Sequence, residues 1–483
     1  MSGRTLVIGL DGATFTLLDS LVAEGVMPSV GRLMSEGVRA HLRTVTPALA
    51  APAWASLLTG CPPGRHGVFD RVRAESLETR HCRFVDSRDV ACGTIWTIAH
   101  QDGLRVTALN FPLAFPTPDM SGLIIPAWVP WPQLRDASHP PDLFERLESL
   151  PGFNPRDLAT EVEIDVRGAQ GGALAEHELL IERQIRRDER WLEVLGHLAG
   201  DGPTELSAVL FDGIGKVQDQ RGRLLDPAAG DSREGHRKEG RRDIWRAYFR
   251  RLDRLVARLC ESMGEKATVF VVSVPGSRPA GKAFALNSWL EERGYPAWAV
   301  PTSNGIHVVV SRSGSPGLPA DQYHAFREKL IQELLDLRDP VSSQPQLARI
   351  WTREEAFAGP LMALAPDLSL EWGNGEPPSA DRSHGVFIAH GPGVRRGATL
   401  LQTSMLDVAP TLLHSLGVAI PAEIEGRVRE EIFEPETPGK RPMQTSRADS
   451  SPFVPAPAPP APVLRVEEER MIADRLRELG YIE

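Results

Sequence analysis

Short apolar, strand-prone runs alternate with helical patterns along most of the chain, and this alternation constrains the fold more than any other feature. Amphipathic helical patterns fall between the runs, for example at residues 14–36 and 244–263. Strands that alternate with helices favour a mainly parallel sheet covered by helices on both faces. We therefore predict an α/β fold, with candidate strands at residues 4–10, 104–110, 122–125, 206–211, 268–274, 306–311, 366–372 and 386–390.

Size and charge narrow the class of protein. Of the 483 residues 41% are hydrophobic, which is enough to build one large α/β domain with insertions. The 54 basic and 64 acidic residues give a net charge of −10. This balance argues against a general binder of nucleic acids or anionic membranes, so we expect no nucleic-acid partner.

The N-terminus and the cysteines favour a cytoplasmic protein. The opening MSGRTLVIGLDGA runs within a few residues into an apolar strand and lacks the longer apolar stretch of a secretory signal. The longest apolar runs fall far short of the ~20 residues that a membrane helix requires, so we expect no membrane insertion. Cys61, Cys82, Cys92 and Cys260 show neither a CxxC pair nor a metal-binding spacing, and we expect four free thiols.

Two stretches interrupt the alternation of strands and helices. Residues 128–203 are Pro-rich at first and then form one charged helical pattern near 174–198, which we interpret as a cap insertion at the edge of the sheet. Residues 225–243 are polar, Gly-rich and basic. They predict a solvated loop more readily than a phosphate-binding patch, because the chain as a whole is acidic.

The composition changes after residue 433, where we expect the α/β domain of residues 1–433 to end. Residues 434–463 are rich in Pro and Ser and predict an extended linker. Residues 464–483 then carry an amphipathic helical pattern. We expect this C-terminal helix to dock on its own domain rather than on a partner, and its apolar positions are Val466, Met471, Ile472, Leu476 and Leu479.

Eight segments in chain order carry a family resemblance. They are VIGLDGATFTLLDSLVAEGVMPSVGRLMSEGV, PALAAPAWASLLTGCPPGRHGVFD, IWTIAHQDGLRVTALNFPLAFPTP, FALNSWLEERGY, APDLSL, GVFIAHGPGV, MLDVAPTLLHSLGVAIPAEIEGRV and RLRELGYIE. Together they resemble the cytosolic type I phosphodiesterase/nucleotide pyrophosphatase branch of the alkaline phosphatase superfamily. The resemblance implies an alkaline-phosphatase-like fold with a mainly parallel central sheet flanked by helices.

The resemblance also implies a mechanism for active members of the family. A Thr or Ser at a helix N-terminus attacks phosphorus, and two zinc or manganese ions activate it. Asp and His residues at the carboxyl ends of the strands hold the ions. A hydroxyl is a poor nucleophile until a metal lowers its pKa, and the paired cations neutralise charge on the attacking and leaving oxygens.

The first two positions of that machinery already diverge. Asp11 in GLDGA matches the first ligand, although an Asp at this position could instead cap the following helix. The nucleophile position is Ala50, whose methyl group can neither attack phosphorus nor bind a metal. The residues of the surrounding pattern are nevertheless intact: Pro47, Pro52, Ala53, Trp54, Ser56, Thr59 and Gly60.

The remaining five ligand positions are all altered. The pair that usually reads Asp and His after a buried strand is Gly215 and Asp219. The next Asp–His pair is replaced by Val274 and Pro275, and the last His by Asp381. One of the seven positions is therefore unchanged, two have become Asp, and four carry no usable side chain.

Three residues close to these positions are weaker candidates. Thr46 lies four residues before Ala50 and would need a different loop path to replace it. His384 would point elsewhere unless its loop changed register. We expect His66, in PGRHGVFD, to be a structural hydrogen-bonding residue rather than a catalyst.

These substitutions predict a catalytically inactive member of the superfamily. It would act as a structural, binding or regulatory subunit, without a cofactor and with a protein partner or larger assembly. An alternative is a weak metal-dependent phosphodiesterase or phosphohydrolase, in which Asp11, Asp219 and Asp381 hold a single Mg²⁺, Mn²⁺ or Ca²⁺ ion. A third reading is a phosphate- or nucleotide-sensing module at the helix that starts near Pro52.

Overall fold

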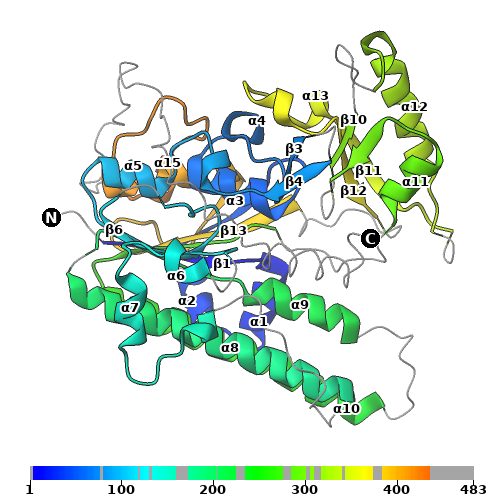
Figure 1. Cartoon of the computed structure of the whole chain (residues 1–483). Coiled ribbons are helices and arrows are strands. Elements are labelled where there is room, and N and C mark those ends of the chain that lie inside the picture. The colour runs from blue at the N-terminus through cyan, green and yellow to red at the C-terminus, as the bar shows by residue number, and fades with distance from the viewer. Residues whose placement is uncertain are drawn as a thin grey trace.

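The computed structural model shows a large central sheet with helices on both faces and a smaller sheet beside it (Figure 1). It describes residues 4–76, 80–117, 120–129, 133–158, 172–202, 204–224, 234–275, 284–300, 305–308, 317–339, 343–373 and 383–435. Apart from residues 434 and 435, the predicted linker and C-terminal helix lie outside these ranges.

The large sheet has eight strands in the order β14-β2-β13-β8-β1-β7-β5-β6. Strand β13 runs antiparallel to both of its neighbours, and every other neighbouring pair is parallel, which confirms the predicted mainly parallel sheet. All residues of β1, β5 and β7 are buried, which explains why these strands read as mainly apolar runs. The strands are β1 (Thr5–Leu10), β2 (Val38–Arg43), β5 (Val106–Phe111), β6 (Gly122–Pro126), β7 (Leu206–Phe211), β8 (Thr268–Val272), β13 (His384–His390) and β14 (Ala398–Ser404).

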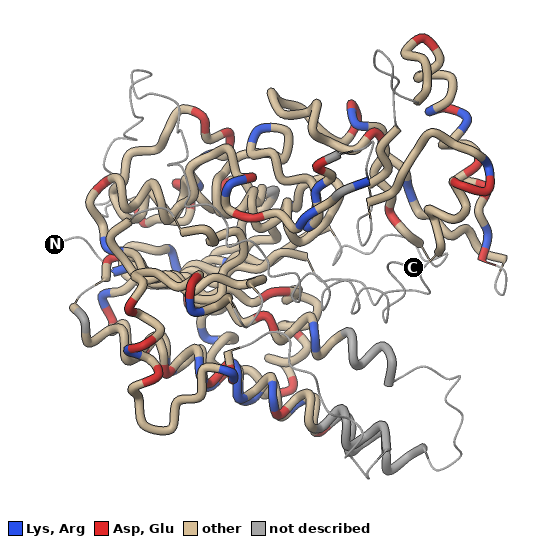
Figure 2. The backbone as a smooth tube through the Cα atoms, viewed as in Figure 1, with Lys and Arg blue, Asp and Glu red and all other residues tan. Residues whose placement is uncertain are grey.

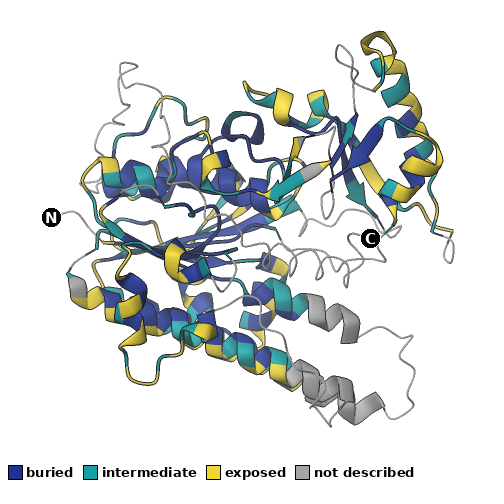
Figure 3. Ribbon diagram, in the orientation of Figure 1, coloured by how far each residue is buried: buried dark blue, intermediate teal, exposed yellow. Residues whose placement is uncertain are grey.

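Two hydrophobic clusters cover the two faces of this sheet (Figure 3). Strand β1 contributes Leu6, Ile8 and Leu10 to the first cluster and Val7 to the second, as the alternation of side chains along a strand requires. The first face carries α1 (Phe15–Ala23), α2 (Pro28–Glu36), α7 (Leu143–Glu148), α8 (Gly172–Leu198), α9 (Gly213–Leu224) and α10 (Glu234–Met263). The second face carries α3 (Ala50–Thr59), α5 (Ile95–Gln101) and α15 (Val408–Leu416).

The predicted helix at residues 14–36 is two helices. Gly25 has a φ of 70°, a conformation that glycine adopts without steric cost, and α2 then starts with Pro28 in its first turn. A buried carboxylate from α10 receives the free N–H groups of that turn: Ser29 N donates to Asp253 Oδ2 at 3.1 Å and Val30 N to Asp253 Oδ1 at 2.9 Å. The chain therefore changes direction between α1 and α2, and Asp253 of α10 caps the N-terminus of α2.

The predicted loop at residues 225–243 is wrong in its second half, because α10 already begins at Glu234. Arg, Lys and Glu are good helix formers, and here they extend a helix whose later turns are anchored on the sheet. The charged helix predicted near 174–198 is α8, which packs along α10 and over β5 and β7.

Two of the candidate strands, at residues 306–311 and 366–372, do not belong to the large sheet. They correspond to β10 (Gly305–Val308) and β12 (Leu368–Trp372), which join β9 (Ala297–Ala299) and β11 (Leu347–Thr352) in an antiparallel sheet. Together with α11 (Leu286–Glu292) and α12 (Tyr323–Leu335) this sheet builds its own hydrophobic cluster. Residues 284–373 therefore contain a small subdomain.

The subdomain contacts the loop region that follows α3. Leu361 N donates to Gly64 O at 2.8 Å, and the rings of Phe69 and Phe357 meet edge to face at 4.9 Å.

All four cysteines are free thiols, as predicted. Among the helices that the structure describes, none combines the length and the apolar character that a membrane crossing requires.

Candidate functional site

The carboxyl ends of the neighbouring parallel strands β8, β1 and β7 form the candidate site. Asp11 follows β1 directly, and its backbone carbonyl accepts a hydrogen bond from Gly215 N at 3.2 Å. On the other side of β1, Ser273 Oγ donates to Ala13 O at 2.6 Å. The loops after the three strands are thus tied together, as expected where parallel strands end at one sheet edge.

Helix α3 begins at Ala50 and is held against Asp11. Its N-cap, Leu49, offers no side chain to the free N–H groups of the first turn. One turn into the helix, the indole N–H of Trp54 donates to Asp11 Oδ1 at 3.2 Å. Trp54 is fully buried and meets the ring of Phe111 edge to face at 5.7 Å. The intact Trp in the family pattern therefore positions a helix whose N-terminal residue, Ala50, is exposed and carries no hydroxyl.

The residues at the end of β8 are packed rather than presented to a ligand. Val274 is fully buried, and the close approach of the neighbouring strand β13 requires a glycine. A Cβ on Gly385 would lie 2.0 Å from the carbonyl oxygen of Ser273 and 3.4 Å from the Cα of Val274. Val274 thus lies in the core at a position where the resemblance predicts a metal ligand, and Pro275 follows it directly.

The structure brings together Asp11, Ala50, Gly215 and Val274 from the seven predicted positions, with Pro275 adjacent in sequence. Asp219 lies on α9, one turn after Gly215, but its side chain is outside the description. Asp381 also lies outside the described residues. His384 pairs with Ser383, whose Oγ lies 2.9 Å from its Nδ1, and its ring stands edge to face with His41 at 5.8 Å.

His66 has the structural role expected of it. The side chain is fully buried, Val68 N donates to its Nδ1 at 3.1 Å, and its Nε2 lies 2.9 Å from Ser56 Oγ. Since Nδ1 accepts a hydrogen bond, Nε2 carries the proton and donates to Ser56. Burial lowers the pKa of His66 to about 3, so the ring is neutral. It joins α3 to the loop that follows.

Sequence patterns alone did not reveal a buried ion network beneath the same sheet edge. Charged residues lie mainly on the outer helices and loops (Figure 2), but Arg187 of α8 is only 3% exposed. Its Nη1 pairs with Asp212 Oδ1 directly after β7, and its Nη2 donates to Asn110 Oδ1 at 2.9 Å. Lys216 Nζ donates to the second oxygen of Asp212 at 2.9 Å. Two cations of the chain itself therefore neutralise the Asp212 carboxylate.

A second carboxylate extends this network into the core. Asp188 is 1% exposed, and it accepts hydrogen bonds from Gln184 Nε2 and from Tyr248 OH, each at 2.9 Å. Burial and the nearby charge of Asp212 raise the pKa of Asp188 to about 7, although Arg187 opposes the rise. The helical period of α8 places Arg187 and Asp188 on its apolar face, and this is the signal in the sequence that could have revealed them.

The two carboxylates nearest the site, Asp11 and Asp212, have pKa values shifted in opposite directions. Burial alone would raise the pKa of Asp212, but Arg187 and Lys216 outweigh it and lower the pKa to about 2. Burial and the charge of Asp212 raise the pKa of Asp11 to about 7, against the opposing effects of the Trp54 indole and of Lys216. Asp212 is thus held ionised by Arg187 and Lys216, whereas the raised pKa of Asp11 favours its neutral form.

The described residues do not fit a two-metal centre. In that part of the chain, no group of three or more His, Cys, Asp or Glu side chains is arranged to hold a metal ion. Asp11 faces an indole N–H donor, Asp212 is already paired twice, and Gly215, Val274 and Pro275 offer no side-chain ligand.

Solved structures of similar fold show the fold class of this chain, and a family model shows its family. Two structures of murine ectonucleotide pyrophosphatase/phosphodiesterase 5, one of them of an inactive variant in complex with AMP, superpose with TM-scores of 0.53 and 0.54. Both cover 89% of this chain and 100% of the relative, at 13% and 14% identity. The human counterpart gives a TM-score of 0.50 at 13% identity and covers 86% of this chain and 95% of its own.

These matches show an alkaline-phosphatase-like fold. The model of the type I phosphodiesterase / nucleotide pyrophosphatase family matches residues 5–387, and the chain belongs to this family. No curated protein sequence matches the chain.

Proposed function

We propose that the chain is a catalytically inactive member of its family that serves as a structural, binding or regulatory subunit in the cytoplasm. Its partner would be a protein or a larger assembly rather than a nucleic acid or a membrane. The observation that carries the proposal is the Arg187–Asp212–Lys216 ion network at the sheet edge where the family's metal ligands are expected.

The first support comes from the nucleophile position. Ala50 stands at the N-terminus of α3, and Trp54 holds this helix against Asp11. The geometry that would aim a hydroxyl at phosphorus is therefore kept, while the hydroxyl itself is missing. A neighbouring Thr could take over only with a different loop, because Thr46 precedes α3 and is separated from it by Pro47.

The second support is electrostatic. A metal ion at this edge would meet the guanidinium of Arg187 and the ammonium of Lys216, both already on Asp212. Like charges at such short range disfavour a further cation, and displacing Arg187 would leave a buried charge unpaired. The chain's own cations thus supply the positive charge that metals supply in active relatives.

The alternative is a weak phosphohydrolase with a single Mg²⁺, Mn²⁺ or Ca²⁺ ion on Asp11, Asp219 and Asp381. Three carboxylates would suit a hard cation. Only Asp11 of the three has a described side chain, and it accepts a hydrogen bond from Trp54 rather than facing an open set of oxygen ligands.

A turnover assay separates the two functions. The purified chain is incubated with bis(4-nitrophenyl) phosphate and, in turn, with Zn²⁺, Mn²⁺, Mg²⁺ and Ca²⁺. We expect no release of 4-nitrophenol above that of an Asp11→Asn variant. Metal-dependent release that saturates with substrate and is lost in the Asp11→Asn variant would establish the alternative.

A further inference from the structure

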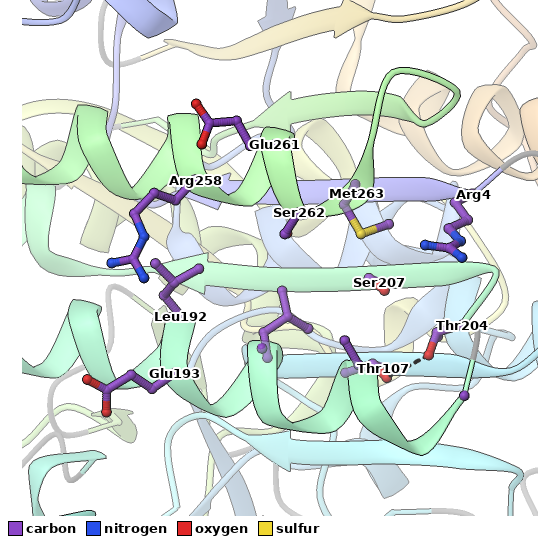
Figure 4. Close-up of a pocket in the computed structure, with 14 residues that line it drawn as sticks. Arg4, Thr107, Leu192, Glu193, Thr204, Ser207, Arg258, Glu261, Ser262 and Met263 are labelled. Atoms are coloured by element: carbon purple, nitrogen blue, oxygen red, sulfur yellow. Dashed lines mark hydrogen bonds between the residues drawn. The ribbon is translucent and has the colours of Figure 1, made fainter.

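A groove of about 810 Å³ lies at the opposite, amino-terminal edge of the large sheet (Figure 4). The last turns of α8 and α10 form its sides, and the first residues of β5 and β7 form its floor. It is therefore separated from the candidate site by the whole length of the central strands.

The floor of this groove is hydroxylic where the rest of the sheet face is apolar. Further along the same strands, Leu109 and Val209 belong to the hydrophobic cluster, but Thr107 and Ser207 stand on the same face at the groove. Ser207 is 5% exposed, and its hydroxyl makes no hydrogen bond to any described residue. Thr107 has only a long contact of 3.5 Å, to Thr204. Both hydroxyls therefore keep hydrogen-bonding capacity that a ligand in the groove would use.

The charges around the groove favour an anion. Arg4 lies at the same end as the three hydroxyls, and Arg258 lies at the other end (Figure 4). Neither arginine forms an ion pair within the described part of the chain. Of the two acidic residues of the rim, Glu193 is paired with Arg190, and Glu261 points away from the groove (Figure 4).

The space between the two ends is lined by apolar side chains. Leu192 and Leu195 of α8 and Met263 at the end of α10 line it, with Leu192 near Arg258 and Met263 near Arg4 (Figure 4). Gly196 also lines the groove and leaves open space there, because a Cβ placed on it would meet no described atom within 4 Å. The groove thus offers a polar, positively charged end and an apolar body of a size that suits a small molecule.

We propose that this groove binds a small amphipathic anion. Its carboxylate or phosphate-monoester head lies against Arg4, Ser207 and Thr204, and its unbranched apolar body lies between Leu195 and Met263. The site is independent of the proposed loss of catalysis, since it shares no residue with the carboxyl edge of the sheet.

Calorimetric titration of the full chain tests this site with four probes: octanoate, octyl phosphate, 1-octanol and octylamine. Octanoate or octyl phosphate should bind with a Kd at or below about 1 mM, and whichever binds more tightly identifies the head group. Octanol should bind more weakly because it leaves Arg4 unpaired, and octylamine should not bind.

Four variants locate the binding. Arg4→Ala should weaken the anionic probes about five- to tenfold and leave octanol unchanged, because it removes a charge-assisted contact at the exposed end. Gly196→Trp should abolish binding of all probes by filling the groove, and circular dichroism verifies its fold. Ser207→Ala, which removes only the hydroxyl, should weaken the anions several-fold. Arg250→Ala, on the exposed surface of α10, is the matched control and should bind like the wild type.

Two results would overturn the proposal. One is the absence of binding of both anionic probes to the wild type at millimolar concentration. The other is binding that Arg4→Ala, Ser207→Ala and a folded Gly196→Trp all leave unchanged, since the probes would then occupy another surface.

Discussion

Arg187 on α8 and Asp212 after β7 form a buried ion pair beneath the sheet edge at which the family's metal ligands are expected. The arginine side chain is 3% exposed and the aspartate side chain 12%. The pair joins α8 to the end of β7, and together with Lys216 it places two cationic groups on one carboxylate at this edge. Removing the guanidinium would therefore affect stability, and not only the chemistry of the site.

Substitution Arg187→Met should destabilise the fold by about 3 kcal/mol, because it keeps much of the side-chain volume but leaves Asp212 short of a buried partner. The double variant Arg187→Met with Asp212→Asn should recover most of that loss. Urea unfolding measures both. The control is Arg251→Ala, which breaks an exposed pair with Glu189 and should cost at most about 1 kcal/mol. Equal losses in the two single variants would contradict a special role for the buried pair.

Stability should depend on pH through Asp188 and, in the same sense, through Asp11. The folded-state pKa of each is about 7 and lies above the value of about 3.9 in an unfolded chain. Between these values the native state binds more protons than the unfolded state, so the free energy of unfolding falls as pH rises from 4 through 7. Asp212, with a pKa lowered to about 2, acts in the opposite sense and only below about pH 4.

Asp188→Asn cannot ionise, so it should flatten this decline by about 4 kcal/mol between pH 4 and pH 8. Denaturant midpoints measured across that range provide the comparison. Asp136→Asn, at an exposed position, is the control and should keep the slope of the wild type. An unchanged slope in Asp188→Asn would show that Asp188 is ionised throughout.

Substitution Ala50→Thr alone should not create phosphodiesterase activity. The new hydroxyl would stand at the N-terminus of α3 without metals to lower its pKa, and its reactivity would remain that of an ordinary alcohol. Turnover of bis(4-nitrophenyl) phosphate in the presence of Zn²⁺ or Mn²⁺ is the readout. Appreciable activity from this single change would reveal a functional metal site.

Much of the fold follows from local sequence patterns. The buried strands β1, β5, β7 and β8 are mainly apolar runs because helices cover both sheet faces, and such runs are recognisable in the sequence. Strand β2 escaped prediction because its burial alternates and its sequence, VRAHLR, carries three charged or polar residues. The break between α1 and α2 escaped because the apolar period continues across Gly25.

The sequence reveals the predicted positions and the ion network to different extents. Asp11, Ala50, Gly215 and Val274 could be picked out because each sits in a segment with an ordered family pattern, and their assignment as nucleophile or ligand positions stays a prediction. The partnership of Arg187 with Asp212 could not, because it joins residues 25 positions apart on different elements. A contact of this kind depends on how α8 packs on the sheet, and no local period encodes it. The antiparallel subdomain escaped for the same reason, since β10 and β12 pair across a long separation.

The metal content of the purified full chain is the most direct test of the proposed loss of the catalytic centre. The protein is expressed with Zn²⁺ and Mn²⁺ in the medium, freed of loosely bound ions by gel filtration, and measured by inductively coupled plasma mass spectrometry. We predict far less than one metal ion per chain, equal to that of an Asp11→Asn variant. One or two tightly held ions per chain that disappear in Asp11→Asn would show that a metal centre persists, and would contradict the proposal.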